Sequence, residues 1–348
     1  MLSRRDRSFI ISNTIQTTMA PILLPSNQPP ERFYHGGPQI SALRSEPMSG
    51  PREPEDWVAS TTCCHGCQSS KLGMSKLPDG RLLADAIASD PNTWLGPDHV
   101  NRHGVDTKLL LKLLDAGQRL PVHAHPHVDW AIKHVGARHG KAEAWYILTP
   151  GEIHLGLKED MSLEELLEIV NTQNSEAMLA KMHKLSVQSH QVVYVPPGML
   201  HAIGKGIFMV ELQEPEDLSV LVEWKGYDID GTKDGHLGLG FPTALTAVDC
   251  KARTAEQMSR LITTATTGSV VAKESEEYFI LERVQVQQSE QCAAGFAIMI
   301  VLEGALTLTT AIRETVDLKK GHALVIPYGD GAFTLTGSGD VLIARPPQ

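Results

Sequence analysis

Histidine is unusually frequent in this 348-residue chain, which contains 15 of them, seven between His99 and His139. Two of these, His123 and His125, are separated by a single residue. On a β-strand, residues i and i+2 point to the same face, so both imidazoles would enter the same space. Because borderline divalent metals favour imidazole nitrogen, this pair could supply half of a four-ligand metal site.

Two later segments carry side chains that could complete such a site. Glu143 lies on a predicted strand whose alternate positions include Lys141 and Trp145. Residues 193–204 contain the pattern Pro-x-Gly-x-x-His, which predicts a tight turn leading His201 into a strand. A lone histidine is more often a packed or surface residue than a ligand. Three histidines and one glutamate on strands nevertheless suit the inner wall of a small β-barrel, and we predict a metal site formed by His123, His125, Glu143 and His201.

The cysteines give a weaker signal. Cys64 and Cys67 form a Cys-x-x-Cys pattern with His65 between them. A zinc knuckle needs four ligands, and no second cysteine pair lies at a suitable spacing. A redox motif would follow a strand and precede a helix, whereas residues 68–70 are typical of a loop. The pattern therefore favours neither a metal nor a redox role.

Composition excludes several classes of protein. The chain has 31 Lys and Arg against 41 Asp and Glu, a net charge of −10, with 42% hydrophobic and 21% charged residues. These values are typical of a globular protein. The acidic balance argues against a nucleic-acid partner, and no apolar stretch reaches the 18 residues that a membrane-spanning helix needs. Five cysteines are too few for a disulfide scaffold and fit a reducing compartment, so we expect a cytoplasmic protein.

The first half of the chain mixes irregular and regular segments. Residues 1–30 are predicted to be a disordered tail, and residues 31–94 an irregular wrap with a few edge strands. The apolar block 109–114 could be a buried strand or a short helix, because periodicity cannot separate the two. A short helix is predicted over 127–139, with strands at 144–148 and 153–157. A helical insertion around 160–184 begins at a capping box formed by Ser162 and Glu165.

The remainder favours short strands. After residue 184 they are expected at 185–187, 191–195, 207–213 and 218–224, followed by a glycine-rich loop over 226–240. Six more strands are predicted after residue 277, separated by turns such as those at 303–304 and 328–329. Many short strands with regular turns predict a mainly β chain with two sandwich or barrel units, the first carrying the helical insertion.

Three ordered motifs resemble those of the type I mannose-6-phosphate isomerase family, a zinc-dependent group in the cupin superfamily. The family's Gln-x-His-Pro, Gly-Lys-x-Glu-x-Trp-Tyr and Val-Pro-x-Gly-x-x-His-Ala-x-Gly correspond here to residues 123–126, 140–146 and 195–204. The resemblance covers roughly residues 33–250, and the second β unit more loosely. It implies zinc ligands at His123, His125, Glu143 and His201.

The resemblance also implies a domain organisation. The fold would be mainly β, with two cupin-like β-barrel or jelly-roll units. Residues 31–255 would form the metal-binding catalytic domain, and residues 256–348 a degenerate cupin-like domain. In that second domain Ala332 stands where a metal-binding histidine would be, so this half is predicted to be metal-free and structural.

Two positions depart from the family pattern. His123 replaces a glutamine, which gives a ligand set of three histidines and one glutamate, similar to cupins that use iron or manganese. Leu221 stands where the family places a catalytic arginine, and Lys225 or Arg253 could compensate. Basic residues near the motifs do not by themselves locate a phosphate-binding site, because lysines are mostly surface residues; they are Lys133, Arg138, Lys141 and Lys158.

The function that the resemblance implies is a metal-dependent aldose–ketose isomerase, which interconverts mannose 6-phosphate and fructose 6-phosphate through an enediol. One divalent ion is expected, zinc first, with iron and manganese open. Lys141 would bind substrate or transfer a proton, and Glu211 would be an orienting carboxylate. The partner is a small sugar or sugar phosphate, and the oligomeric state is open. The alternatives are a metal-dependent oxygenase or lyase acting on a small organic substrate, and a non-catalytic sugar-binding cupin.

Overall fold

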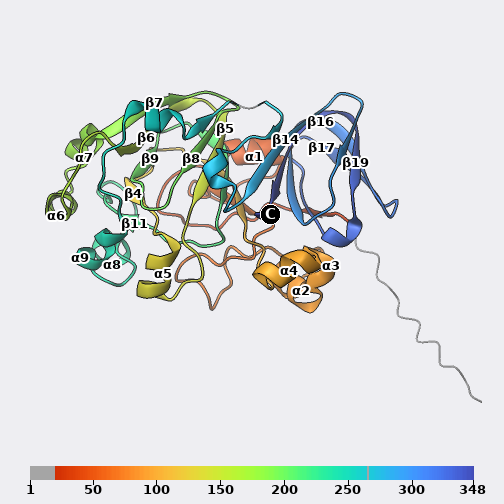
Figure 1. Ribbon diagram of the computed structural model, residues 1–348, viewed down its shortest axis with the longest axis horizontal. Helices are drawn as coiled ribbons and strands as arrows, with labels where there is room; N and C mark the ends of the chain where they lie inside the picture. Colours follow the sequence, from red (N-terminus) through yellow and green to blue (C-terminus); the bar gives the residue numbers. More distant parts are fainter. Residues whose placement is uncertain (1–19, 265) are drawn as a thin grey trace, which may run out of the picture.

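A computed structural model describes residues 20–264 and 266–348, and its chain is mainly β, as predicted (Figure 1). The described strands form three sheets, and all of their pairings are antiparallel. None of these sheets closes on itself within the described residues, so the sandwich form of the prediction is correct and the closed barrel is wrong. The division into two cupin-like units stays a prediction.

Two sheets carry the motifs and pack face to face. The six-stranded sheet has the order β12 (Ile262–Thr263), β8 (Val192–Val195), β5 (Glu143–Thr149), β10 (Phe208–Gln213), β3 (Leu110–Asp115) and β2 (Glu55–Val58). The five-stranded sheet has the order β11 (Val220–Leu221), β4 (His123–Ala124), β9 (His201–Ile203), β6 (Gly151–Leu157) and β7 (Met182–Val187). One buried cluster joins them, with Trp145 and Met209 from the first and Ile153 from the second.

The third sheet is built mainly from the last eighty residues. Its order is β1 (Ile22–Leu24), β18 (Ala323–Ile326), β16 (Ala297–Thr310), β19 (Phe333–Arg345), β14 (Ile280–Val286) and β13 (Gly268–Ser269). Two further strands pair at its side, β15 (Ser289–Cys292) with β19 and β17 (Thr315–Lys319) with β16. Because β1 pairs with β18, the predicted disordered tail is wrong for residues 20–30. Residues 1–19 lie outside the described part of the chain.

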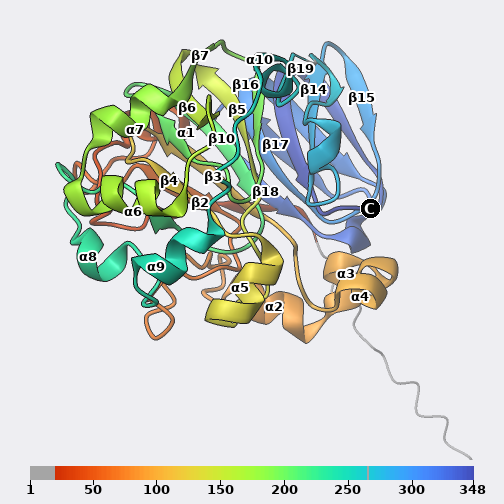
Figure 2. The same ribbon diagram turned by 60° about the vertical axis from the view of Figure 1, so that its left-hand side comes forward.

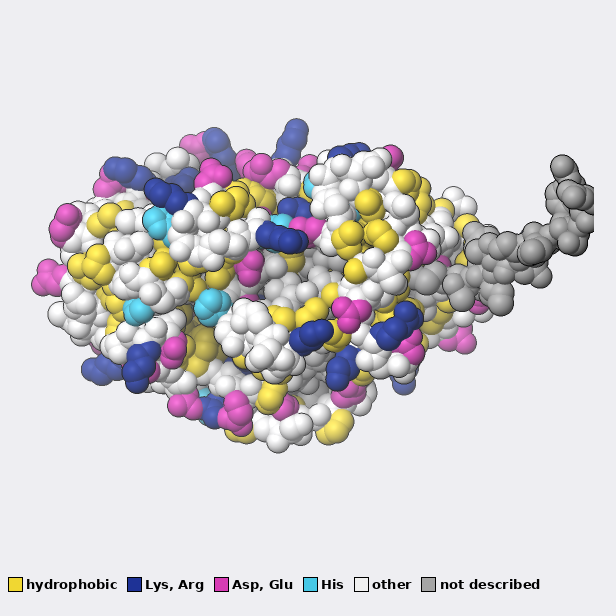
Figure 3. Space-filling view, turned by 90° about the horizontal axis from the view of Figure 1, so that it is seen from below, with side chains coloured by type: hydrophobic (Ala, Val, Ile, Leu, Met, Phe, Trp, Pro, Cys, Tyr) yellow, Lys and Arg dark blue, Asp and Glu magenta, His cyan; other side chains and the backbone are white. Residues whose placement is uncertain are grey.

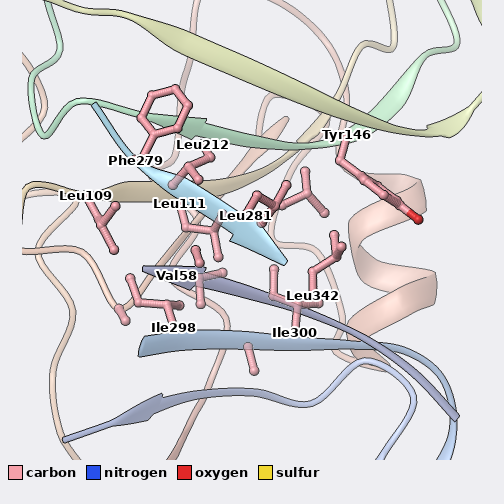
Figure 4. Close-up of a cluster of buried hydrophobic side chains, with 14 of the residues drawn as sticks. Val58, Leu109, Leu111, Tyr146, Leu212, Phe279, Leu281, Ile298, Ile300 and Leu342 are labelled. Carbon is pink, nitrogen blue, oxygen red and sulfur yellow. The ribbon is translucent and has the colours of Figure 1, made fainter. Parts of the chain in front are cut away.

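The six-stranded sheet is buried on both faces. Its second face shares the largest hydrophobic cluster with the third sheet, where Leu111 and Leu212 meet Leu281, Ile298 and Leu342 (Figure 4). Every residue of β3 and β10 is buried. This double burial explains the continuous apolar block at 109–114, which is a strand for all but its first residue rather than a helix.

The helices lie at the margins of the sheets (Figure 2). The predicted helices are confirmed as α5 (Val128–Val135), α6 (Leu163–Thr172) and α7 (Ser175–Lys181). Ser162 accepts the backbone N–H of Glu165 at 3.1 Å, as the capping pattern predicts. Short helices α8 (Gly231–Asp234), α9 (Phe241–Ala244) and α10 (Ala255–Ser259) follow β11, and three 3₁₀ turns lie at Leu245–Ala247, Lys273–Ser275 and Tyr328–Asp330.

The irregular wrap predicted for residues 31–94 is wrong in part. It contains α1 (Pro38–Arg44), α2 (Leu83–Ser89) and most of α3 (Pro91–Leu95), and α4 (Pro97–His103) follows directly. Three of these helices begin at a proline, which is favourable at a first helical position although it is also a loop signal. They have only five to seven residues each, too few for an apolar periodicity to be visible.

Two predicted turns lie inside long strands instead. β16 continues through residues 303–304 with a register shift between Val301 and Glu303, and β19 joins the strands predicted at 332–335 and 341–344. Gly304 has a φ of 89° and a side chain there would collide with the backbone of Ser338 on β19. A bulge and a turn both favour glycine at positive φ, so the local sequence could not separate them. The strand predicted at 218–224 is shorter, with only β11, and the 226–240 loop contains α8.

Candidate active site

Neighbouring strands of the five-stranded sheet place the three histidines together. His123 on β4 and His201 on β9 are direct cross-strand partners, and His125 follows β4 immediately. The Pro-x-Gly turn before β9 holds the segments in place, because the N–H of Gly198 donates to the carbonyl of His125 at 2.6 Å. Gly198 has a φ of 84°, a left-handed conformation that glycine adopts without steric cost. The predicted turn therefore has a specific function: it ties one histidine segment to the other.

The three imidazoles face one another. Their ring centroids are 4.9 Å apart for His123 and His125, 4.1 Å for His123 and His201, and 4.9 Å for His125 and His201. One side-chain nitrogen from each lies within 4.8 Å of the others, the only grouping of this kind among the residues that the structure describes. The three rings can therefore bind one ion together.

Backbone carbonyls fix the tautomer of each ring. The Nδ1 atoms donate to the carbonyl oxygens of Pro121 at 2.8 Å, of Leu218 at 2.7 Å and of Met199 at 2.9 Å. A carbonyl can only accept, so Nδ1 carries the proton and Nε2 keeps its lone pair. Hydrogen bonds of this kind, made by the ring nitrogen that does not bind the metal, orient histidine ligands in metal sites.

Burial keeps all three histidines neutral. It lowers the pKa of His123 to about 3, and the neighbouring His201 and the ammonium of Lys141 add to this effect. Burial also lowers the pKa of His125 and of His201 far below the ordinary value, with Lys141 contributing at His125. A neutral imidazole is the form that binds a metal, so no proton has to leave at physiological pH.

Glu143, at the start of β5, brings a carboxylate to the same point. Its Oε2 is 3.2 Å from Nε2 of His125, and its Oε1 is 3.2 Å from Nε2 of His201. Trp145 donates to Oε1 at 3.1 Å. Burial alone would raise the pKa of Glu143, but Lys141, a hydrogen bond with Glu211 and the nearby Lys112 together outweigh burial, and the pKa lies below its ordinary value.

These atoms pass a simple test for a bound cation. The carboxylate oxygens and the Nε2 lone pairs are all acceptors, and acceptors that face each other in a buried site are unfavourable without a donor or a cation between them. Nε2 of His201 is buried and has no hydrogen-bond partner among the described residues, whereas the ammonium of Lys141 lies beside Oε2 of Glu143 and Nε2 of His125. The donor set of three imidazoles and one carboxylate suits a divalent transition metal.

The two predicted catalytic residues lie beside this centre. Nζ of Lys141 is 3.0 Å from Nε2 of His125 and 3.3 Å from Oε2 of Glu143. It is also 3.9 Å from Oε1 of Glu211, which lies on β10. Burial raises the pKa of Glu211 to about 7, and the charge of Glu143 adds to it although Lys112 opposes it. The structure thus brings together all six residues that the sequence singled out; their roles remain predictions.

A transverse row of side chains crosses the six-stranded sheet next to them. Cross-strand pairing aligns Trp57 on β2, Lys112 on β3, Glu211 on β10 and Trp145 on β5. Nζ of Lys112 lies 3.4 Å from Oε2 of Glu55 and 3.6 Å from Oε2 of Glu211, and 4.7 Å from the centre of the Trp57 ring. The neighbouring buried charges alternate in sign, from Glu55 through Lys112 and Glu211 to Lys141. Each buried charge therefore has one of opposite sign beside it, which avoids the cost of burying a charge alone.

A small cavity runs along these groups. It is lined by His123, Lys141, Glu143 and Glu211, and also by residues that the sequence did not single out, namely Arg32, Tyr34, Glu55, Lys112 and Asp217. Lys112 carried a usable signal, because one lysine interrupts five buried leucines between residues 109 and 114. Arg32, Tyr34 and Glu55 come from the segment interpreted as an irregular wrap and had none.

Leu221 lines the same cavity, directly opposite His123 in the strand pairing. Neither of the residues proposed to compensate for it reaches the cavity. Lys225 is exposed, and Arg253 forms an ion pair with Asp249 at 2.7 Å. Of the four basic residues noted near the motifs, only Lys141 lines the cavity, and the rest are exposed; they are Lys133, Arg138 and Lys158.

Fold and site together define a β-sandwich protein with a buried histidine–glutamate cluster suited to a divalent metal. Comparison with known proteins then identifies the family. The model described as "Mannose-6-phosphate isomerase, cupin domain" matches residues 270–346. Mannose-6-phosphate isomerase from Streptococcus mutans is 30% identical over 249 residues, covering 68% of this chain and 73% of that protein. The chain therefore belongs to the mannose-6-phosphate isomerase family, which confirms the resemblance.

Other relatives agree. Mannose-6-phosphate isomerase ManA from Bacillus subtilis is 28% identical over 246 residues, covering 68% of this chain and 74% of that protein. The crystal structure of the mannose 6-phosphate isomerase from Bacillus subtilis superposes with a TM-score of 0.71 at 23% identity, covering 94% of this chain and all of that one. A putative mannosephosphate isomerase from Archaeoglobus fulgidus gives a TM-score of 0.71 at 20% identity, over 93% and 99% of the two chains. These two structures establish the fold.

Two surface observations complete the description. On the face seen from below, basic and acidic side chains are interspersed and do not gather into one basic area (Figure 3). No helix in residues 20–264 and 266–348 is both long enough and apolar enough to cross a membrane.

Proposed function

We propose that this protein is a metal-dependent aldose–ketose isomerase that interconverts mannose 6-phosphate and fructose 6-phosphate. One observation carries the proposal: three imidazoles and the carboxylate of Glu143 converge at one buried point, beside a cavity whose lining includes Lys112, Lys141 and Glu211. Family membership supports the substrate, because the relatives from Streptococcus mutans and Bacillus subtilis are named mannose-6-phosphate isomerases.

The metal would be held by His123, His125, Glu143 and His201. We propose zinc, since three nitrogens and one oxygen suit its four-coordinate geometry. When bound, a divalent ion polarises the oxygens of the sugar and stabilises the enediol that lies between aldose and ketose.

The protein's own residues would bind the substrate and move the proton. Isomerisation removes a proton from C2 of the aldose and returns one to C1, so a donor and acceptor must lie within hydrogen-bond reach of both carbons. Lys141 is placed for this role, because its Nζ lies between the metal cluster and Glu211. Glu211 would orient Lys141 and Lys112, which both approach its carboxylate. The cavity walls keep bulk water away from the enediol.

The test pairs metal analysis with an isomerase assay. We expect the purified protein to contain one zinc per chain and to convert mannose 6-phosphate into fructose 6-phosphate. His201→Ala should lose both the metal and the activity. His134→Ala is the matched control, since His134 stacks on Trp130 of α5 outside the cluster. A zinc-loaded protein that converts neither sugar phosphate, or an iron-loaded protein that consumes oxygen, would overturn the proposal.

A further inference from the structure

Arg32 reaches the cavity from a segment that carries no metal-site residue. Its Nε donates to Oε1 of Glu55 at 3.1 Å. Its Nη2 is 3.9 Å from Oδ2 of Asp217, which is beyond hydrogen-bond distance. Among the described residues, the two Nη nitrogens of Arg32 therefore have no hydrogen-bond acceptor. A guanidinium has five N–H donors, so four of them remain available to a ligand.

The other two cations of the cavity are occupied differently. Lys112 lies between the carboxylates of Glu55 and Glu211. Lys141 lies between those of Glu143 and Glu211 and contacts an imidazole of the metal cluster. Each ammonium thus has two carboxylates within 3.9 Å, whereas the Nη nitrogens of Arg32 have one among the described residues, Asp217, which at 3.9 Å is beyond hydrogen-bond distance.

Glu55 fixes the direction of the guanidinium. Besides Arg32, it accepts hydrogen bonds from the hydroxyl of Tyr34 and from Nε1 of Trp57, both at 2.7 Å. With Lys112 nearby, four groups share its negative charge. Arg32 is therefore pre-oriented by its Nε while its planar Nη pair stays free, the geometry that binds a carboxylate or phosphate in a bidentate manner.

Arg32 also marks the place where the cavity meets the surface. It lines the inner cavity together with His123 and Lys141, and it lines an open hollow at the surface together with Phe33, Trp224 and Tyr227. A hexose 6-phosphate has its reacting carbons at one end and its phosphate at the other. With the histidines at the inner end, a phosphate would be at the outer one.

We propose that Arg32 is the phosphate-binding residue of the site, and so the residue that selects a phosphorylated sugar. This inference rests on the proposed function. Leu221 leaves its own part of the cavity without a cation, and Arg32 supplies a guanidinium from a different segment of the chain.

The test separates binding of the phosphate from chemistry at C1 and C2. In Arg32→Met, we expect KM for mannose 6-phosphate to rise about 10- to 100-fold, the usual effect of losing hydrogen bonds to a charged group. We expect kcat to change by less than about threefold, because the lost interaction is equal in ground and transition states. Arg260→Met is the matched control: Arg260 pairs with Glu256 on the exposed surface, neither residue lines the cavity or the hollow, and both constants should stay unchanged. A fall in kcat with unchanged KM, or no change in either, would overturn the proposal.

A binding measurement keeps the inference independent of turnover. Calorimetry with glucitol 6-phosphate, which cannot isomerise, should show the same 10- to 100-fold weaker binding to metal-loaded Arg32→Met and unchanged binding to Arg260→Met. If Arg32→Met does not fold, Arg32→Lys can be used instead. Lysine keeps the positive charge but lacks the two planar Nη groups, so this variant should bind glucitol 6-phosphate more weakly than the unmodified protein does. Equal affinities would overturn the inference. An inactive wild-type protein that binds glucitol 6-phosphate through Arg32 would overturn only the isomerase proposal.

Discussion

The pairing of Lys112 with Glu211 allows a quantitative test of how charge is balanced beside the metal cluster. Lys112 is 3% exposed and Glu211 is also 3% exposed, and their Nζ and Oε2 atoms are 3.6 Å apart. Lys112→Met would leave the carboxylates of Glu55 and Glu211 in a buried site without their shared cation. Removing one partner of a buried pair costs about 3–5 kcal/mol, so we expect a loss of that size in the free energy of unfolding.

The double variant Lys112→Met/Glu211→Gln separates this penalty from a loss of packing. Gln fills nearly the same volume as Glu but carries no charge, so one of the two uncompensated carboxylates disappears. We expect the double variant to be more stable than Lys112→Met alone, with a coupling energy of about 1–3 kcal/mol. Part of the cost should remain in the double variant, because Glu55 still lacks Lys112 there, although Arg32, Tyr34 and Trp57 continue to donate to its carboxylate.

The assay is urea unfolding of the four proteins of the cycle, all freed of metal, at one pH and one ionic strength. Metal removal matters because a bound ion would add its own stabilisation to any variant that retains it. Strictly additive effects of the two substitutions would refute the reasoning, since they would mean that Lys112 and Glu211 stabilise the fold independently. A Lys112→Met protein as stable as the unmodified one would refute it as well.

Three further predictions follow from the geometry. Removing metal with a chelator should lower Tm for the unmodified protein but leave Tm of His201→Ala unchanged, because only the former gains stability from an ion. Gly198→Ala should lower the free energy of unfolding by about 1–2 kcal/mol because its backbone is left-handed, and it should also weaken metal binding because the turn holds His125. Gly206 also has a positive φ, of 91°, but open space around it. Gly206→Ala should therefore lower the free energy of unfolding by about the same amount and leave metal binding intact. Burial raises the pKa of Asp330 to about 6, with Glu314 adding to it, and its carboxylate oxygens have no partner among the described residues. Its ionised form is thus penalised in the fold, so Asp330→Asn should raise unfolding stability by about 1 kcal/mol above pH 6, and this gain should vanish below about pH 4. Equal gains at pH 4 and pH 7 would contradict the last prediction.

The cluster of three histidines and Glu143 could be predicted because its sequence signals are local. The His-x-His pair, Glu143 and the Pro-x-Gly turn before His201 are each short patterns with a direct meaning for strand geometry. The motifs do not specify which strands pair. His123 lies opposite His201 because β4 and β9 are antiparallel neighbours.

The outer part of the cavity could not be predicted in the same way. Arg32 and Glu55 precede His123 by more than sixty positions. Glu55 reaches the cavity because β2 pairs with β3, and Arg32 is held beside it by hydrogen bonds to Glu55 and to the carbonyl of Arg52. No periodicity in residues 20–94 signals this contact, because the helices and strands there have only three to seven residues each and the sequence is rich in glycine and proline. The turn predicted at 303–304 failed for a different reason: a glycine at positive φ marks a bulge as readily as it marks a turn.

The six-stranded sheet has a consequence that extends beyond the site. Along β3 and β10, Lys112 and Glu211 point toward the cavity, while their neighbours Leu111 and Leu212 point into the core shared with the third sheet. A slip of one residue in either strand would exchange ionic groups for hydrocarbon on both sides at once, so the register is locked from two directions. The third sheet is in this sense part of what keeps the buried charges of the cavity in place. The six-stranded sheet packs against the third sheet on one face and lines the cavity on the other. A substitution that destabilises the core between these two sheets should therefore also disturb the cavity.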